Sequence, residues 1–373
     1  MLHLKTNHSA LREALAIAGR GVTGRNPQPV QNAVLLKADT EPSATLAATD
    51  LEFAGVVTPM PCEIVDGGAL CVPWRLLSEI AGKLPSGLVE LQEQANHILR
   101  VTAAGAQFDL RCLPADDWQG LPEPEGDYNV AIPQADLLRV IEQGAFCTSS
   151  DETRPTMTGA LFLFGGGGLT VASTDTYRLA VARCETDARD DWTHSTIVSS
   201  RALAAVAAVL DVNAEDYCVL DVADACVSFL VGKTVISTRP IDGQYPNWLE
   251  VIPEPGPTRI AFPVGDLLDC LNRLRPIARL DAERIVLRAD GEGVNLRARG
   301  QDTGEADEWM DGIEYDGDWL EVAFNGQFLA DALSNLPGRG IADVAIGGPN
   351  ESLLWECDEL PGWQYVLMPM VVM

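Results

Sequence analysis

The sequence predicts an α+β protein made of three copies of one module, each a mostly antiparallel sheet with two helices on one face. The chain has 373 residues, which is too long for one ordinary core and divides into three units of about 124 residues. A strand-like stretch followed by an amphipathic helix occurs three times, and a second helix recurs at steps of 126 residues. Landmarks that keep the same order and spacing indicate an internal repeat.

The first recurring element is the strand-like stretch with its amphipathic helix. Residues 2–4 lead into a helix expected at 9–20, residues 130–133 into one at 134–147, and residues 260–263 into one at 264–275. Each helix has apolar residues at helical spacing, which predicts one face packed on a core. Equivalent leucines, Leu11, Leu137 and Leu267, are 126 and 130 residues apart.

The second recurring element is a helix expected at residues 74–84, 199–210 and 326–336. The segments that lead into it start at Val72, Val198 and Phe324, so both steps are 126 residues. Short polar side chains at the start of a helix accept hydrogen bonds from its first free N–H groups. We therefore expect Ser199 and Asn325 to be N-caps.

Stretches typical of β-strands lie between the two helices of each repeat, at residues 45–57, 169–181 and 293–305. The first two carry a Thr-Asp pair, at 49–50 and 174–175, again 125 residues apart. Segments rich in Pro, Gly and acidic residues at 121–128 and 253–257 are typical of linkers. The expected domains are therefore residues 1–125, 126–255 and 256–373.

Several motifs that could suggest catalysis are better explained as structure. Residues Gly19–Gly24 match GxGxxG, but they follow a helix and precede prolines, so we expect a helix end and a loop there rather than a dinucleotide site. Gly165–Gly168 is expected to be a hairpin turn, and the four scattered histidines form no local zinc motif. The sequence predicts no enzyme, no catalytic residue, no cofactor and no metal site.

The cysteines and the apolar runs indicate a cytoplasmic protein without a membrane partner. The nine cysteines are odd in number and have no CxxC spacing, so most are expected to be small buried hydrophobes in a reducing compartment. No apolar run approaches the ~20 residues that span a bilayer. The first residues also lack the features of a signal peptide.

The net charge of −28, from 26 Lys+Arg and 54 Asp+Glu, should repel bare nucleic acid. The charge is uneven, however, because the six expected helices carry a net +1 and leave −29 for the rest of the chain. Such helices could meet phosphate through weak, salt-sensitive contacts that do not depend on sequence, or they could simply carry mixed surface charge. Their basic residues are Arg12, Arg20, Arg75, Lys83, Arg139, Arg201, Arg273 and Arg275.

Five further motifs, in chain order, resemble those of the bacterial sliding clamp family, the β subunit of the replicative DNA polymerase III. They are GRNPQP at 24–29, LPADDW at 113–118, STDTYRLAV at 173–181, DGQYPNW at 242–248 and LMPMVVM at 367–373. The resemblance covers the whole chain, and the last three motifs together are specific.

This resemblance implies a three-domain protomer that dimerises head to tail into a closed ring of six modules. Helices would line a hole that encircles double-stranded DNA, so enclosure would hold the DNA without net attraction. By similarity, Phe108 and Leu110 of domain one would meet a hydrophobic patch near Ile277 of domain three at the homodimer interface. Arg25 and Arg154 would lie in loops that touch the DNA backbone.

The family also has a peptide pocket between domains two and three, where the replicative polymerase, the clamp loader and repair proteins insert a short motif containing Gln, Leu and Phe. Apolar side chains and methionine suit a pocket that repacks around different ligands, although such residues could also be the core of a domain joint. The matched positions are Met157, Thr174, Tyr177, Arg178, Leu179, Pro246, Val251, Val366 and Met368, with Pro369 and Met370 beside them.

The sequence departs from the family pattern at the rim of this pocket. Thr176-Tyr177 replaces a Gly-His pair, Asn247-Trp248 an acid and a tyrosine, Glu250 a basic residue, and Val371-Val372-Met373 a C-terminal Arg-Leu. Partner preference is therefore expected to differ from that of a standard replicative clamp. The alternatives are a secondary clamp, a clamp carried by a phage or plasmid, or a repeat scaffold that binds peptides without encircling DNA.

Overall fold

The computed structural model describes residues 1–373 except 23–27, 41–42, 51–54, 119, 122–127, 190, 291–292, 301–303, 318 and 373. The described residues form six α-helices and 26 strands. Every strand pairing among them is antiparallel, so the predicted α+β class with antiparallel sheets is confirmed.

The chain divides into two compact units rather than three. The first unit contains residues 1–135 and 201–240, and the second contains residues 136–200 and 241–373. The middle sequence repeat therefore contributes to both units. The domain boundaries expected from the sequence, 1–125, 126–255 and 256–373, remain predictions.

All six predicted helices are present. They are α1 (His8–Ala18), α2 (Trp74–Ala81), α3 (Gln134–Gly144), α4 (Ser200–Ala207), α5 (Val264–Ala278) and α6 (Gly326–Leu333). The side chain of Asn325 accepts a hydrogen bond from the Phe328 N–H at 3.1 Å, which confirms it as the N-cap of α6. The largest difference in length is at α4, which is four residues shorter than predicted, and α5 is longer than predicted because it continues through Pro276 to Ala278.

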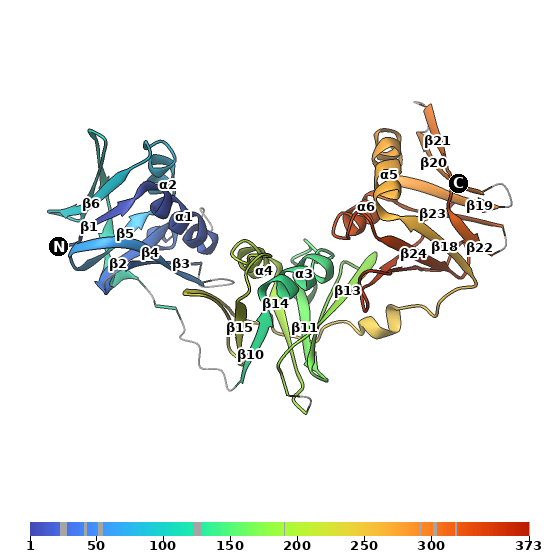
Figure 1. Ribbon diagram of the computed structural model, residues 1–373, viewed down its shortest axis with the longest axis horizontal. Coiled ribbons are helices and arrows are strands. Elements are labelled where there is room, and N and C mark those ends of the chain that lie inside the picture. Colours follow the sequence, from blue (N-terminus) through green and yellow to red (C-terminus); the bar gives the residue numbers. More distant parts are fainter. Residues whose placement is uncertain are drawn as a thin grey trace. The chain divides into compact units, whose positions relative to one another are not determined.

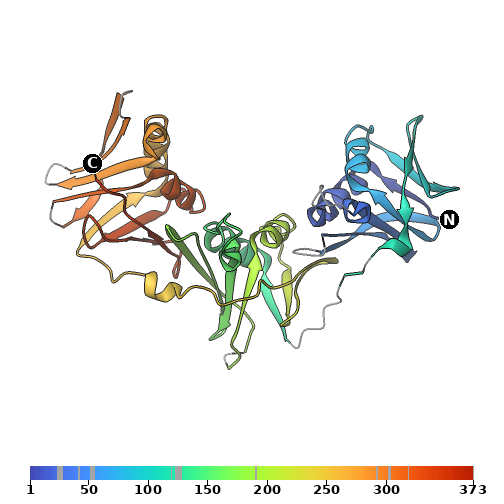
Figure 2. The same cartoon turned by 180° about the vertical axis from the view of Figure 1, so that it is seen from behind.

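The first unit is a 13-stranded sheet that carries α1 and α2 side by side (Figures 1 and 2). Its core contains alternate residues of the strands together with Leu11, Leu15 and Leu77 of the two helices. The Trp74 Nε1–H at the start of α2 donates to the Leu15 carbonyl at 2.9 Å and joins the helices. The strands are β1 (His3–Asn7), β2 (Ala33–Thr40), β3 (Ser43–Thr49), β4 (Gly55–Asp66), β5 (Gly68–Pro73), β6 (Leu88–Gln94), β7 (Ile98–Ala103), β8 (Ala106–Arg111), β9 (Leu113–Pro114), β10 (Tyr128–Pro133), β15 (Tyr217–Val222), β16 (Val227–Val231) and β17 (Thr234–Thr238).

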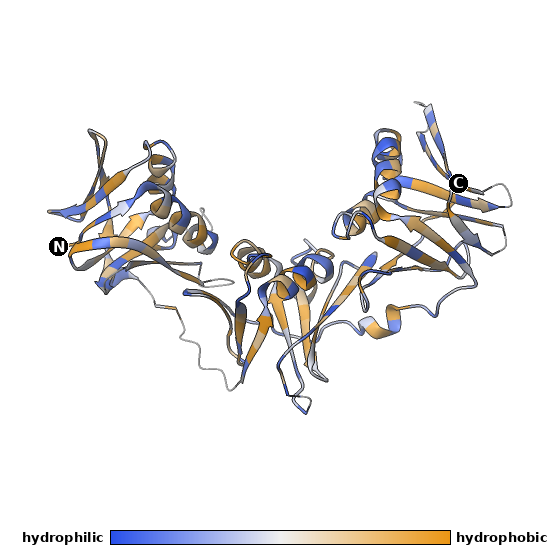
Figure 3. Cartoon of the chain, in the orientation of Figure 1, coloured by the Kyte–Doolittle hydropathy of each residue, from blue (hydrophilic) through white to orange (hydrophobic). Residues whose placement is uncertain are grey.

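The second unit contains a nine-stranded sheet and a four-stranded sheet, with α5 packed against α6. Hydrophilic and hydrophobic residues mix along these helices, as expected for amphipathic helices (Figure 3). The larger sheet has β11 (Gly159–Gly165), β12 (Gly168–Thr174), β13 (Arg178–Glu185), β14 (His194–Ser199), β18 (Thr258–Pro263), β22 (Glu314–Asp316), β24 (Ile341–Ile346), β25 (Leu353–Cys357) and β26 (Gln364–Leu367). The smaller has β19 (Arg284–Asp290), β20 (Gly293–Gly300), β21 (Gly304–Met310) and β23 (Leu320–Asn325).

Consecutive repeats are joined inside each unit by one pair of edge strands. In the first unit, β17 of the second repeat pairs with β4 of the first, with Val235 opposite Val57. In the second unit, β26 of the third repeat pairs with β13 of the second, with Val366 opposite Leu179. The same kind of strand pairing therefore occurs at both joints between repeats, and each joint makes one continuous sheet.

Two smaller predictions are also confirmed. Gly166 and Gly167, with φ of 57° and 70°, form the turn between β11 and β12. These left-handed values favour glycine, which explains the glycine run there. Seven of the nine cysteines are buried, and Cys62 and Cys112 are half-buried.

Candidate functional site

The turn between β12 and β13 places several of the predicted pocket residues. The Asp175 carboxylate accepts the N–H of Tyr177 at 3.0 Å and the N–H of Arg178 at 3.1 Å. The Thr174 hydroxyl donates to the Arg178 carbonyl at 2.8 Å and accepts the Thr176 N–H at 3.1 Å. Four hydrogen bonds within five residues make this a tight turn. It also holds Thr176 at φ 79°, a conformation that costs energy for a β-branched residue.

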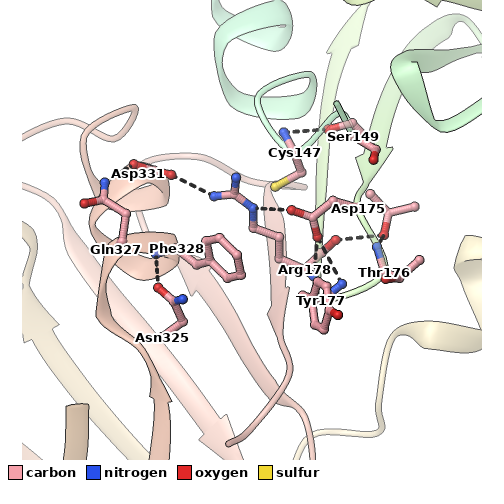
Figure 4. Close-up of polar contacts among 12 residues, drawn as sticks. Cys147, Ser149, Asp175, Thr176, Tyr177, Arg178, Asn325, Gln327, Phe328 and Asp331 are labelled. Carbon is pink, nitrogen blue, oxygen red and sulfur yellow. Dashed lines mark hydrogen bonds and ion pairs between the residues drawn. The ribbon is translucent and has the colours of Figure 1, made fainter. Parts of the chain in front are cut away.

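Arg178 joins this turn to helix α6 (Figure 4). Its Nε donates to Asp175 at 2.9 Å, and its Nη1 donates to Asp331 at 2.9 Å. The guanidinium lies over the ring of Phe328 at 4.2 Å, a cation–π contact. Gln327 holds the other oxygen of Asp331 at 2.6 Å. The charge of Arg178 is therefore matched by carboxylates of the chain itself, and its side chain is only 11% exposed.

Burial has opposite effects on the pKa values of Arg178 and of the neighbouring Cys147. Desolvation alone would lower the pKa of Arg178, but the nearby ionisable groups of Cys147 and Tyr365 and the hydrogen bonds to Asp331 and Asp175 outweigh it, so the pKa is raised. Burial raises the pKa of the neighbouring Cys147 thiol well above its usual value, against the opposing effect of the Arg178 charge. Arg178 thus stays charged and Cys147 stays a neutral thiol near pH 7.

The C-terminal segment lies against the same turn. The Met368 N–H donates to the Tyr177 carbonyl at 3.0 Å, continuing the ladder between β13 and β26. Two residues later the Met370 N–H donates to the Ala323 carbonyl of β23 at 2.7 Å. These bonds hold Tyr177 and Met368 next to each other, with their side chains 63% and 43% exposed.

An apolar cluster lies beneath this surface. Leu179 and Val366 are buried together with Tyr245, and Trp248 and Ile252 pack against them. The Tyr245 hydroxyl accepts the Thr174 N–H at 3.2 Å, and burial raises the pKa of that hydroxyl. The segment 245–252, which includes a 3₁₀ turn at Trp248–Val251, is thereby fixed beside β13 and β26.

The predicted pocket residues fall into buried and exposed groups. The buried members are Met157, Leu179 and Val366, the half-buried ones are Thr174, Arg178, Pro369 and Met370, and the exposed ones are Tyr177, Pro246, Val251 and Met368. Met157 lies in the 3₁₀ turn Pro155–Thr158, and a Cβ on Gly243 would lie 2.7 Å from the Thr156 methyl, so loop 242–246 adjoins that turn. Leu249 was not among the residues predicted for the pocket, but it is 62% exposed between Trp248 and Glu250.

The predicted DNA-binding residues differ in whether their positive charge is paired with a carboxylate of the chain. Arg12, Arg20, Lys83 and Arg275 are exposed and make no ion pair among the residues that the structure describes. The others are paired: Arg75 with Glu79, Arg139 with Asp136, Arg154 with Asp151, Arg201 with Asp50, and Arg273 with Glu308. Arg25 lies outside the described residues.

Among these ion pairs, the one between Arg201 and Asp50 includes a buried carboxylate. Asp50 closes β3 and is 2% exposed, while Arg201 itself is half-buried on α4. Both belong to the first unit. The pair connects the Thr-Asp element of the first repeat to the second helix of the next, as Arg178 does between Asp175 and α6 in the second unit.

The residues predicted for the dimer interface differ in how exposed they are. Phe108 on β8 is exposed, but Leu110 is buried in the core of the first unit, so Phe108 provides the accessible apolar surface. Ile277 is half-buried near the end of α5, where Leu280 is more exposed. Within the described parts of the chain, β8 pairs only with β7 and β21 pairs only with β20.

The described residues contain no group of three or more His, Cys, Asp or Glu side chains placed to hold a metal ion. Within the same residues, no helix is long and apolar enough to cross a membrane.

Comparison with known proteins gives matches along almost the whole chain. Profiles of the DNA polymerase III beta subunit match residues 2–122 (N-terminal domain), 131–247 (central domain) and 249–371 (C-terminal domain). The beta sliding clamp of Synechocystis sp. is 29% identical over 362 residues, covering 91% of this chain and 92% of its own. That of Pseudomonas aeruginosa is 25% identical over 370 residues, covering 99% and 100%.

Solved structures agree with these matches. A crystal structure of the P. aeruginosa DnaN sliding clamp bound to griselimycin superposes with a TM-score of 0.92 at 25% identity, covering both chains fully. The C. crescentus beta sliding clamp, with PEG bound to a putative beta-motif tethering region, gives a TM-score of 0.89 at 26% identity over both full chains.

Proposed function

The chain belongs to the DNA polymerase III beta subunit family and is a DNA sliding clamp, and we propose that it works as a homodimeric ring around duplex DNA. It is a non-catalytic processivity subunit. The observation that carries this conclusion is the match of all three family domains, in order, to the three repeats of the chain. The cytoplasm is the compartment in which such a ring would act.

Two edge strands of the chain, β8 and β21, support ring closure. Repeats inside the chain join through edge strands, β4 with β17 and β13 with β26. Among the described residues, β8 in the first unit and β21 in the second each pair with one neighbour only, as do the other edge strands β9, β10, β14, β22 and β23. Pairing β8 of one protomer with β21 of its partner, twice, would close a head-to-tail ring and leave neither edge exposed.

The side chains on these edges are complementary in character. Phe108 is exposed on β8, and Trp309 is exposed on β21. Strand β8 ends at the exposed Arg111, and its Asp109 pairs with Arg100 within the chain. Strand β21 carries the exposed Glu305, while its Asp307 and Glu308 pair with Arg297 and Arg273. Apolar contact at the centre with opposite charges at the margin is typical of a stable interface.

Enclosure explains how so acidic a chain holds DNA. The first unit offers free positive charges at Arg12 on α1, at Arg20 in the 3₁₀ turn that follows α1, and at Lys83 just after α2. The second unit offers one at Arg275 on α5. A few weak phosphate contacts that do not depend on base sequence would guide the DNA without arresting it. The ring would keep the DNA from leaving sideways.

A surface of exposed apolar residues would bind the short motifs of the polymerase, the clamp loader and repair proteins. It consists of Tyr177, Leu249, Val251 and Met368, and the buried Leu179 and Val366 lie beneath it. Clamps of P. aeruginosa and C. crescentus have been crystallised with griselimycin and with PEG, respectively, which supports a ligand site in this family. The hydrogen bonds that fix Met368 and Met370 prepare this surface in advance, which lowers the entropic cost of binding.

Topological loading tests the proposal directly. The protein, with a clamp loader and ATP, is placed on nicked circular DNA, which is then linearised. Retention on the circle with loss from the linear form is expected for a ring. Equal retention on both forms, or a stable monomer by solution mass, would instead favour a scaffold that binds peptides without encircling DNA.

A further inference from the structure

The segments that form the candidate peptide surface are strongly acidic. Residues 151–158, 174–179, 242–254 and 364–372 contain six carboxylates and two guanidinium groups, a net charge of −4. Both guanidinium groups already have carboxylate partners in the chain, since Arg178 binds Asp175 and Asp331 and Arg154 lies near Asp151. No cation on these segments is free to receive an acidic ligand.

Four carboxylates on the same segments have no such partner. Glu152, Asp242, Glu250 and Glu254 are exposed and make no ion pair among the described residues. Glu250 lies between the exposed Leu249 and Val251, and Glu254 follows four residues after Glu250. Asp242 precedes Gly243, which contacts the turn that carries Met157. These carboxylates therefore lie on the same segments as the exposed apolar residues of the candidate surface.

An exposed apolar surface bordered by unpaired charge of one sign selects its ligand by both properties. Tyr177 and Met368 can cover an aliphatic or aromatic side chain, whereas the surrounding carboxylates favour a cation and repel another carboxylate. The overall charge of −28 acts in the same direction at longer range.

We propose that this site selects peptides in which the apolar anchor is flanked by Lys or Arg, with Glu250 and its neighbouring carboxylates as the specificity-determining groups. This inference rests on the proposed function, because it assumes that the Tyr177–Met368 surface binds peptides. It adds the chemical class of the preferred partner, a segment with a basic flank.

Two peptides of equal length test the preference. Both carry the same anchor with Gln, Leu and Phe, and one is flanked by two Lys residues and the other by two Glu residues. Because exposed ion pairs contribute little individually, we expect the Lys-flanked peptide to bind about 3- to 10-fold more tightly in 50 mM salt. The ratio should approach one in 1 M salt, where charges more than ~3 Å apart are screened.

Matched variants separate the local effect from net charge. Glu250→Lys should remove most of the difference between the peptides. Glu359→Lys makes the same change in net charge at an exposed position in the turn at the other end of β26 from Met368, and it should leave the difference intact.

The possible results distinguish this inference from the proposed function. If both peptides bind equally, or the Glu-flanked one binds more tightly, the preference is overturned while the peptide site stands. Equal effects of Glu250→Lys and Glu359→Lys would also overturn it, because net charge alone would then explain the result. If neither peptide binds at all, the peptide site itself is wrong, and the preference fails with it.

Discussion

Arg178 and Asp331 lie 153 positions apart in the sequence and are joined by a hydrogen-bonded ion pair of 2.9 Å. The pair connects the turn after β12 with helix α6, and the guanidinium also makes a cation–π contact with the ring of Phe328. Asp175 holds the other side of the guanidinium. Arg178 therefore acts mainly as a link inside the second unit, which positions Tyr177 and the segment bonded to it.

Replacing Arg178 should destabilise the protein and weaken peptide binding together. Arg178→Ala leaves the Asp175 carboxylate, which is 15% exposed, without its cationic partner, so we expect a loss of about 2–4 kcal/mol of unfolding free energy. Asp331→Asn keeps an oxygen that can accept from Arg178 and should cost about 1 kcal/mol or less. Thermal unfolding and peptide titration measure both effects. Wild-type stability in Arg178→Ala would contradict the role of a structural link.

Met368 and Leu179 allow surface binding to be separated from core packing. Met368 is exposed, so Met368→Ala should reduce peptide affinity by about 1–2 kcal/mol and leave stability within about 0.5 kcal/mol. Leu179 is buried, so Leu179→Ala should cost about 2–5 kcal/mol of stability as well as affinity. Calorimetric titration and denaturant unfolding of both variants check this contrast. Unchanged affinity in a folded Met368→Ala would exclude Met368 from the site.

The internal repeats and the hydrophobic periodicity predicted most of the fold, because helices and repeats can be recognised from local sequence patterns. Apolar residues at helical spacing located the first helix of each repeat, and segments recurring at 126-residue steps located the second helix. The two-unit division could not be predicted in this way. It depends on which edge strands meet, and the pairs β4–β17 and β13–β26 join segments far apart in the sequence.

The candidate site was only partly predictable for a similar reason. Motifs identified Tyr177, Leu179 and Met368, which the antiparallel pairing of β13 with β26 brings together. No motif could show that Arg178 is already bound by Asp331, because that contact depends on tertiary packing. The apolar Leu249 directly after the DGQYPNW motif was a signal present in the sequence, whereas its exposure depends on the fold.

Arg201 and Arg12 should have opposite roles, although both were predicted to contact DNA. Arg201→Ala removes a cationic partner of the buried Asp50 carboxylate, so we expect a loss of about 3 kcal/mol in stability. Arg12→Ala should change stability by less than about 0.5 kcal/mol and should reduce the salt dependence of DNA binding slightly. Chemical denaturation and DNA titration across salt concentrations measure these effects. A stable Arg201→Ala variant with weakened DNA binding would reverse the assignment.

Phe108 should control dimerisation without controlling the fold of the protomer. Phe108→Asp places a carboxylate on the free edge of β8, where it would face the acidic strand β21 of a partner protomer in the proposed ring. We expect at least a tenfold weaker dimer and a protomer that remains folded, because the side chain is already 37% exposed. Sedimentation at several concentrations measures the dimer, and circular dichroism checks the fold. Leu110→Asp, at a buried position, should instead unfold the first unit. A Phe108→Asp protein as dimeric as the wild type would rule out this edge as the interface.

Thr176 should be a site where glycine stabilises the protein. At φ 79° a β-branched side chain crowds its own backbone, a strain of about 1–2 kcal/mol that glycine does not have. Glycine also gains about 0.5–1 kcal/mol of conformational freedom in the unfolded chain, so the expected net gain in stability lies between about 0 and 1.5 kcal/mol. The bond from residue 176 N–H to the Thr174 hydroxyl uses only the backbone and should remain. Denaturant unfolding of Thr176→Gly measures the gain, with Thr153→Gly, an exposed position without a positive φ, as the control that should lose stability. A loss at Thr176 equal to that at Thr153 would show that the turn is not strained.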